Sequence, residues 1–315
     1  MQNVRVSDWN DIRYFLAVAR TGSTLGAARA LGVNQSTAAR RVAALETAMG
    51  LKLFDRRQSG YALTEAGERL RPLAERMETE ATGFFDRAGA LARQETCVIR
   101  LTTPEGLANV VIAPALSDFR RLHPELRIDL LVDERRLDIV RGAADVALRT
   151  GAAPDEAGLV GRRLATIAWA AYCSRDYAER HGAPHDVEGL RGHPLVGAEG
   201  PLHALPGWVW LSGVAPDAEV TARSSSITNM VSAVKAGLGI TILPCLLGDS
   251  EPELVRCLGP VEKIGSDLWL LTREELRDVP QVRAFMDFIA AYVTGKRALL
   301  AGRTPQPGAH AGPVG

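Results

Sequence analysis

Apolar residues recur at helical spacing over three short segments at the start of the chain. The first segment, from Ile12 to Ala19, predicts a helix that Gly22 ends. Ser23 is the expected N-cap of a second, alanine-rich helix, TLGAARAL, which closes at Gly32. The short turn Gly32-Val33-Asn34 joins this second helix to a third, and two short helices joined by a glycine-containing turn predict a helix-turn-helix.

The third helix is predicted to begin at Gln35 with Asn34 as its N-cap. Its apolar side consists of Val33, Ala38, Val42 and Leu45. Its polar side offers amide, hydroxyl and guanidinium groups, as contacts to base edges and phosphates in a major groove require: Gln35, Ser36, Thr37, Arg40 and Arg41. These residues alone also fit a plain helical hairpin with a solvated polar face.

The segment DRRQSGYALT predicts two short strands around a turn at Gln58-Ser59-Gly60. Such a hairpin would be a wing, with Arg56 and Arg57 near its tip, where they could reach phosphates or the minor groove. A winged helix-turn-helix is therefore expected.

A long helix is predicted from Glu65 to about Arg93, because apolar residues from Ala66 to Leu91 are spaced by three or four. So narrow an apolar stripe needs a partner helix. That partner is either the body of the same protein or the equivalent helix of a second subunit.

Strand-like and helix-like segments alternate from Val98 onward, which predicts a mostly parallel sheet with helices on both faces. The segment LDIVRGAADVALRTG, for example, is predicted as a helix followed by a strand. The tail from residue 302 is rich in proline and glycine, and is expected to be disordered.

Composition narrows the class of protein. With 46% apolar and 23% charged residues and no run of 18 apolar residues, the chain is expected to be globular, cytoplasmic and without a membrane span. The four cysteines (Cys97, Cys173, Cys245 and Cys257) are far apart in sequence and form no CxxC pair, so we expect reduced core thiols. Net charge is zero, yet residues 1–66 carry nine basic and five acidic side chains, which points to a polyanionic partner for that segment.

The sequence resembles the LysR-type transcriptional regulators through GSTLGAARALGVNQSTAARRVAALE, then GLKLFDRR, then LTEAG. This resemblance implies a winged helix-turn-helix over 1–64, a dimerising linker helix over 65–95 and an effector-binding domain over 96–300, before a tail over 301–315. The effector domain would have two lobes like periplasmic binding proteins, lobe I over about 96–165 and 266–295 and lobe II over about 166–265. The sequence departs from the common family pattern at Ser36 and Ala39. Ala39 lacks a hydrogen-bonding group, although its methyl could touch a thymine.

In such a fold a small molecule would lie in the cleft between the lobes. Thr103 is expected to cap a helix beginning at Pro104, and three consecutive serines to cap a later one. Because helix N-termini with hydroxyl groups suit a carboxylate, an anionic effector is one expectation, and an aliphatic or aromatic effector is the alternative. The candidate effector contacts are Thr102, Thr103, Arg149, Ser224, Ser225 and Ser226. These residues could equally do no more than cap helices. Trp169, Trp208 and Trp210 could line the cleft or belong to the core.

The chain lacks a GxSxG elbow, a phosphate-binding GxxxxGK loop and an HExxH metal motif, so neither an enzyme nor a cofactor is expected. The prediction is a regulator that binds double-stranded DNA as a homodimer or a dimer of dimers, controlled by a small-molecule effector. The alternative is a small-molecule binding module whose N-terminal helices associate with another protein.

Overall fold

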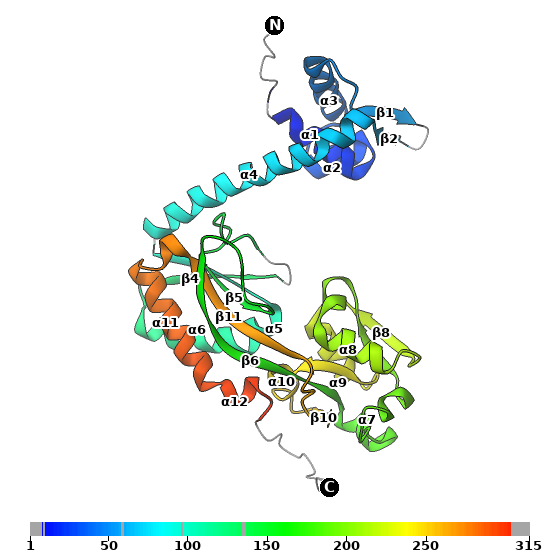
Figure 1. Ribbon diagram of the computed structural model, residues 1–315, viewed down its shortest axis with the longest axis vertical. Helices are drawn as coiled ribbons and strands as arrows, with labels where there is room; N and C mark the ends of the chain where they lie inside the picture. The colour runs from blue at the N-terminus through cyan, green and yellow to red at the C-terminus, as the bar shows by residue number, and fades with distance from the viewer. Residues whose placement is uncertain (1–7, 9, 58–59, 96, 134–136, 304–315) are drawn as a thin grey trace. The chain divides into compact units, whose positions relative to one another are not determined.

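The computed structural model describes residues 8, 10–57, 60–95, 97–133 and 137–303. The chain divides into two compact units, Met1–Phe85 and Asp86–Gly315, which are treated separately (Figure 1). The predicted turn at Gln58-Ser59 and the predicted disordered tail beyond 303 lie outside the described residues. Within the described part, no helix is both long and apolar enough to cross a membrane.

The first unit has the predicted order of three helices and a hairpin: α1 Asn10–Thr21, α2 Thr24–Leu31, α3 Gln35–Met49, β1 Phe54–Arg57 and β2 Gly60–Leu63. The Ser23 hydroxyl accepts a hydrogen bond from the Gly26 N–H, and Gly32 ends α2 in the left-handed conformation, both as predicted. Asn34 is the N-cap residue of α3, but its side chain makes no capping bond, which corrects the expected role. The core of the unit includes Phe15, Val18, Ala38 and Leu45.

The hairpin is held against the turn between α1 and α2. The Tyr61 N–H donates to the Gly22 carbonyl at 2.8 Å, and the Phe54 ring packs between those of Phe15 and Tyr61. Gly60 has a φ of +126°, and a Cβ there would lie 2.4 Å from the Gly22 oxygen. The position therefore requires glycine.

Helix α4, Glu65–Glu95, has the predicted extent and continues through Pro72. Its start is capped by the Thr64 hydroxyl, which accepts from the Gly67 N–H. Leu70 and Ala74 pack on the core of the first unit. Four large apolar side chains of α4 are 46–72% exposed: Leu73, Phe84, Phe85 and Leu91.

The second unit is built on one large sheet of strand order β10-β6-β11-β5-β3-β4, with β9 also paired to β6. The strands are β3 Val98–Thr103, β4 Arg127–Val132, β5 Val146–Thr150, β6 Leu159–Ser174, β9 Thr241–Pro244, β10 Leu254–Leu258 and β11 Gly265–Arg273. A separate parallel pair comprises β7 Leu195–Ala198 and β8 Val220–Ser224. Both predicted lobe boundaries, at 165 and 266, fall inside strands, because β6 and β11 run through both lobes.

The expectation of a mostly parallel sheet is wrong. Only β3 pairs in parallel within the large sheet, with β4 and β5. The strands that cross between the lobes, β6 and β11, are antiparallel to each other, and β6 is also antiparallel to β9 and β10. Alternation of helices and strands along the sequence does not reveal these return strands, since their partners are distant in the chain.

Helices cover the sheet: α5 Glu105–Leu107, continued by a π-helical turn Ala108–Ile112 into α6 Ala113–Leu122, then α7 Arg175–His181, α8 Pro206–Val214, α9 Ile227–Lys235, α10 Cys245–Gly248, α11 Pro280–Gly295 and α12 Arg297–Leu300. Short 3-10 helices span Gly189–Gly192, Gly200–Ala204 and Glu274–Leu276. The helix predicted just before β5 is absent: residues 137–145 form turns, with Gly142 at a φ of +94° and the Asp138 carboxylate accepting from the Arg141 N–H. A left-handed glycine so close to the strand leaves too few residues for a helix.

Candidate functional site

The polar side of α3 is presented as predicted at its N-terminal end. Gln35, Ser36 and Arg40 are exposed, whereas Thr37 is half-buried. The Gln35 amide donates to the Thr24 hydroxyl at 3.2 Å, which orients this side chain from α2. Ala38, Val42 and Leu45 are buried on the opposite side of the helix. The helix therefore offers an amide, a hydroxyl and a guanidinium group on one solvent-facing surface.

Arg41 differs from Arg40 in having acidic partners. Its guanidinium lies 3.2 Å from Asp11 and 2.9 Å from Asp8, on and just before α1. The negative charge of Asp11, followed by the hydrogen bond to Asp8, raises the pKa of Arg41. Arg41 thus fastens α3 to α1, and part of its donor capacity is already used.

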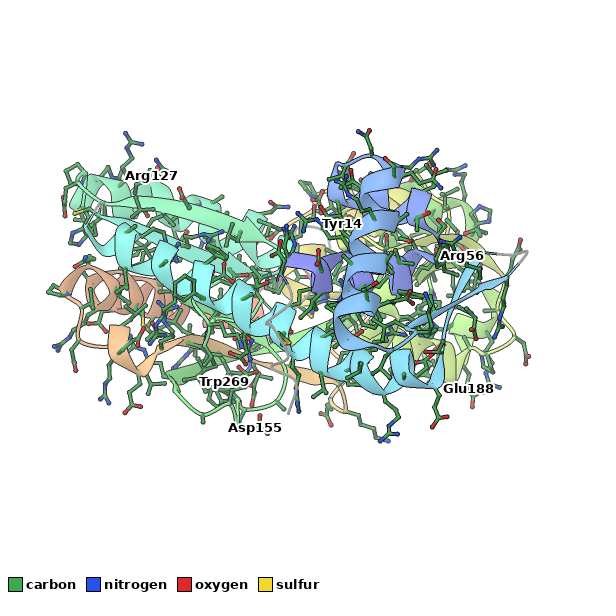
Figure 2. All side chains as sticks on the ribbon, turned by 90° about the horizontal axis from the view of Figure 1, so that it is seen from above. Tyr14, Arg56, Arg127, Asp155, Glu188 and Trp269 are labelled. Atoms are coloured by element: carbon green, nitrogen blue, oxygen red, sulfur yellow. The ribbon has the colours of Figure 1, made fainter. Side chains whose placement is uncertain are left out.

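The wing presents the two predicted arginines on β1, where Asp55, Arg56 and Arg57 are all exposed. The Arg56 guanidinium lies over the Tyr61 ring, 5.6 Å from its centroid, which places this charge on the hairpin. Arg56 is labelled in Figure 2. Arg57 pairs with Gly60 at the end of the ladder.

Glu46 supports the wing from α3, a role that the sequence analysis missed. Its carboxylate accepts from the N–H groups of Leu53 and Phe54, at 2.8 and 3.2 Å, and pairs with Lys52 at 2.8 Å. Burial alone would raise the pKa of Glu46, but these hydrogen bonds outweigh it and lower the pKa. The carboxylate therefore connects α3 to the first strand of the hairpin.

In the second unit, a cavity of about 320 Å³ lies between the lobes. From lobe I it is lined by Thr102, Thr103, Asp133 and Arg149, and from lobe II by Pro201 and Leu205. It therefore brings together three of the six predicted effector residues.

Two buried donors at this cavity have no hydrogen-bond partner among the described residues: the Thr103 hydroxyl and Nε of Arg149. The other guanidinium nitrogens of Arg149 are held by Glu156 at 3.2 Å and by the Leu137 carbonyl. Thr103 does not cap the next helix, because Pro104 is the N-cap residue of α5. Buried polar groups normally find partners, so the two donors mark a place where a ligand could supply acceptors.

The three serines do not line this cavity. Ser226 caps α9 by accepting from the Asn229 N–H, and its hydroxyl donates to the Glu105 carboxylate at 3.2 Å. Ser224 bonds to the backbone of Ser226, and Ser225 is exposed. The capping alternative therefore describes Ser226, and this cavity gives no support to effector contact by the serines.

A second, smaller cavity of about 60 Å³ adjoins the crossing strands and is mostly apolar. Trp169 lines it and donates to the Ser266 hydroxyl at 3.3 Å. Trp208 is a core residue at 4% exposure, and Trp210 packs against the same core. Of the three tryptophans, Trp169 alone lines either interlobe cavity.

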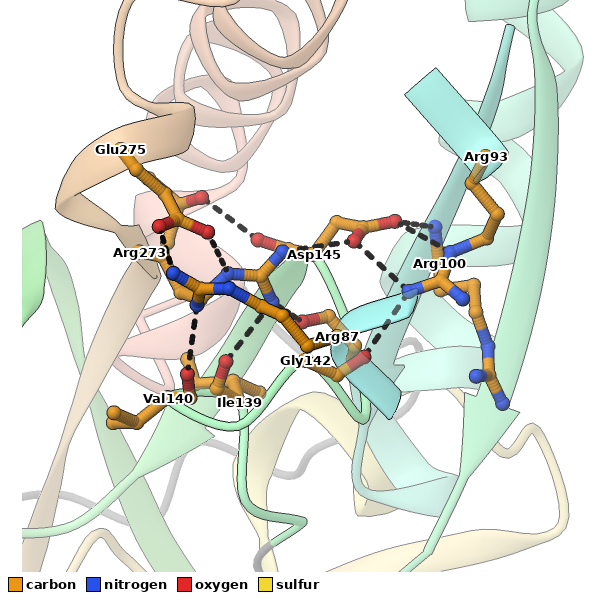
Figure 3. Close-up of polar contacts among 11 residues, drawn as sticks. Arg87, Arg93, Arg100, Ile139, Val140, Gly142, Asp145, Arg273 and Glu275 are labelled. Atoms are coloured by element: carbon orange, nitrogen blue, oxygen red, sulfur yellow. Dashed lines mark hydrogen bonds and ion pairs between the residues drawn. The ribbon is translucent and has the colours of Figure 1, made fainter. Parts of the chain in front are cut away.

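Asp145, just before β5, anchors the end of α4 to lobe I (Figure 3). Its carboxylate accepts two hydrogen bonds from Arg93 at 3.1 Å, one from the Arg100 N–H at 2.9 Å and one from Arg273 at 3.4 Å. Arg87, which precedes Arg93 on α4, pairs with Glu275. Asp145, Arg93 and Arg273 are 3–13% exposed, so this is a buried charge cluster.

A winged helix-turn-helix on the same chain as a two-lobed α/β body with an interlobe cavity defines a class of ligand-responsive, DNA-binding regulators. Residues 9–68 match the family described as "Bacterial regulatory helix-turn-helix protein, lysR family", and residues 92–294 match the "LysR substrate binding domain". The chain belongs to the LysR family of bacterial transcriptional regulators.

Known transcriptional regulators are similar to this chain in sequence and in structure. A probable HTH-type transcriptional regulator of Klebsiella pneumoniae, LtrA, is 29% identical over 304 residues, covering 93% of this chain and 96% of that protein. An HTH-type transcriptional regulator of Xanthomonas campestris pv. campestris is 35% identical over 186 residues, which cover 59% of this chain and 54% of that protein. The solved structure of CrgA, a LysR-type regulator from Neisseria meningitidis, has a TM-score of 0.56 at 24% identity, covering 90% of this chain and 98% of that one. Full-length CbnR, solved with its target DNA, has a TM-score of 0.54 at 19% identity, with 90% and 99% coverage. Both structures are similar to this chain in fold.

Proposed function

We propose that this LysR-type regulator reads its operator with the N-terminal half of α3 and grips the flanking backbone with its wing. Gln35, Ser36 and Arg40 would contact base edges, and Thr37 would flank them. Arg56 and Arg57 would contact phosphates. Arg41 would contribute to the phosphate contact while fastening α3 to α1.

The observation that carries this proposal is the contrast between Arg40 and Arg41. Neighbours in sequence, they differ in surroundings: Arg40 is exposed on α3, while Arg41 is paired with Asp8 and Asp11. An exposed guanidinium at the N-terminal half of a recognition helix suits bidentate contact with guanine.

The test is a fluorescence anisotropy titration of the full chain against its own upstream intergenic DNA at several salt concentrations. Affinity should fall steeply with salt, with a slope of about −0.9 per phosphate contact. Arg40→Ala should cost about 1–3 kcal/mol, roughly 5- to 150-fold in Kd, and relax the sequence preference. Arg283→Ala, an exposed arginine on α11 of the other unit, is the matched control and should bind as wild type. Wild-type affinity for Arg40→Ala would refute the assigned surface, and salt-independent binding would favour the protein-association alternative.

For the effector, we propose a small carboxylate bound in the 320 Å³ cavity. The Thr103 hydroxyl and Nε of Arg149 are the two buried donors there without partners in the described chain, and together they suit an anionic oxygen pair. To test this, the full chain is titrated with a panel of aliphatic and aromatic monocarboxylates, and binding is measured by the change in tryptophan fluorescence. The corresponding neutral amides are the controls. If the amides bind as well as the acids, the cavity does not select for negative charge.

The exposed apolar side chains of α4 support assembly into a homodimer or a dimer of dimers through this helix. Phe84 and Phe85 are 70% and 72% exposed. Phe84→Glu should therefore lower the mass measured by size-exclusion chromatography with light scattering. Val209→Glu, which changes an exposed apolar residue on α8, is the control and should leave that mass unchanged.

A further inference from the structure

Two of the four cysteines, 84 residues apart in sequence, meet in lobe II. The Sγ atoms of Cys173 and Cys257 are 3.1 Å apart, and both thiols are free. Their spacing along the chain does not reveal this contact, because it arises from the pairing of β6 with β10.

The strand register explains the approach. Cys173 on β6 pairs with Val255 on the antiparallel neighbour β10, and Cys257 lies at a bulge between Arg256 and Leu258. Cys257 is the extra residue of this bulge, where the strict alternation of side chains is interrupted, and its sulfur contacts that of Cys173 on the neighbouring strand. A disulfide bond is about 2.05 Å long, so the sulfur atoms need to approach by about 1 Å, without any change of register.

We propose that Cys173 and Cys257 form a reversible oxidation site, at which a hydroperoxide converts the two thiols into an intramolecular disulfide. This inference does not depend on the proposed DNA or effector contacts. It rests on the distance between the two sulfur atoms, the pairing of β6 with β10 and the unequal access of the two cysteines to solvent.

The two cysteines differ in solvent exposure and in the pKa of their thiols. Cys173 is fully buried and Cys257 is half-buried, so an oxidant meets Cys257 first. The hydrogen bond from the Cys257 thiol lowers the pKa of Cys173. The same contact and burial raise the pKa of Cys257, so its thiolate forms only when its proton passes to the Cys173 thiolate across the 3.1 Å contact.

The reaction has two steps. The Cys257 thiolate attacks the hydroperoxide: an S–O bond forms, the O–O bond breaks, and the alcohol (water, for hydrogen peroxide) leaves after taking up a proton. The Cys173 sulfur then attacks the sulfenic acid of Cys257, forming the S–S bond and breaking the S–O bond, and water leaves with the thiol proton. In sum, two thiols lose two electrons and two protons, and the peroxide is reduced.

The bond would join β10 to β6, which is one of the two strands that connect the lobes. Cys173 is the penultimate residue of β6, and β10 leads through residues 259–264 into β11. Because the closed loop is long, the cross-link should also stabilise the folded unit. Cys97 and Cys245 have no cysteine neighbour among the described residues, and burial raises the pKa of Cys245, so both serve as internal controls.

The experiment uses the full reduced chain, treated with a small molar excess of hydrogen peroxide, alkylated with iodoacetamide and digested with trypsin without reductant. Mass spectrometry should find peptide 164–175 joined to peptide 257–263, with the mass of two hydrogen atoms lost. Dithiothreitol should restore both free peptides. The oxidised chain should melt at a higher temperature than the reduced chain. Cys97→Ser should retain the cross-link and this shift, and Cys173→Ser should lose both.

Three results would overturn the proposal. One is Cys257 recovered as sulfinic or sulfonic acid while Cys173 is alkylated. Another is oxidation of Cys97 at the same peroxide dose that leaves Cys173 and Cys257 as free thiols. The third is a cross-link between any other pair. The peptide map of the wild-type chain decides among these outcomes even if Cys173→Ser fails to fold.

Discussion

Replacing Asp145 by asparagine removes the one carboxylate that two buried arginines share at the junction of α4 and lobe I. Arg93 and Arg273 are 13% and 3% exposed at their side chains, so neither can regain full hydration when the charge is lost. Breaking a buried ion pair by removing one partner costs about 3–5 kcal/mol, because the remaining charge stays buried. We therefore expect Asp145→Asn to lower the free energy of unfolding of the second unit by about 3–5 kcal/mol.

Tryptophan fluorescence during urea unfolding suits this measurement, since four of the five tryptophans lie in the second unit. The midpoint should fall without a change in slope, as expected for a loss of stability alone. In a thermal scan the same loss corresponds to a drop of roughly 6–20 °C in Tm for a unit of this size.

The matched control is Asp287→Asn, which removes the carboxylate of the exposed pair between Arg162 and Asp287. Both side chains are at least half exposed, so this change should cost less than about 1 kcal/mol. If Asp145→Asn costs no more than the control, the cluster does not hold buried charge and the reasoning from burial fails.

Three further predictions concern the first unit, each followed by circular dichroism during unfolding. Ser23→Ala should cost about 0.5–2 kcal/mol through loss of the α2 cap, and Ser23→Gly only a few tenths; equal effects would contradict the capping role. Gly60→Ala should cost about 1–3 kcal/mol, because the added Cβ meets the Gly22 oxygen at a φ of +126°, whereas Gly213→Ala on α8 meets nothing; no loss for Gly60→Ala would refute this. Glu46→Gln should destabilise the unit at neutral pH. The pKa of Glu46 is lowered in the folded state. The ionised carboxylate therefore stabilises the fold at pH values above its unfolded-state pKa of about 4.3, and this stabilisation is lost as the pH falls through the folded-state pKa. The two proteins should therefore become equally stable in acid; a constant difference would show that the charge is irrelevant.

Features set by neighbouring residues were predictable from the sequence. The cap at Ser23, the left-handed glycine at Gly32 and the extent of α4 depend on residues within a few positions of one another. The positions of Thr102, Thr103 and Arg149 around one cavity followed from the family resemblance, which supplied the two-lobed fold.

Features set by distant contacts were not predictable. The partners of Arg41 are 30 and 33 residues away, and nothing in its neighbourhood distinguishes it from Arg40. The support of the wing by Glu46 depends on a turn that brings β1 back to α3. The meeting of Cys173 and Cys257 depends on the antiparallel pairing of β6 and β10, which the alternating pattern of strands and helices did not predict.

The sharing of β6 between both lobes also restricts which insertions and deletions the chain can tolerate. Residues 159–168 of this strand pair with β11, and residues 169–174 pair with β9 and β10. Because side chains alternate between the faces of a strand, one inserted residue at the middle of β6 would shift one half of its ladder by a position and turn its side chains to the other face. Trp169 to Ser174 are nearly all fully buried, so that half has no solvent-facing side on which to accommodate the shift. Length variation among relatives should therefore occur in the loops and spare this strand.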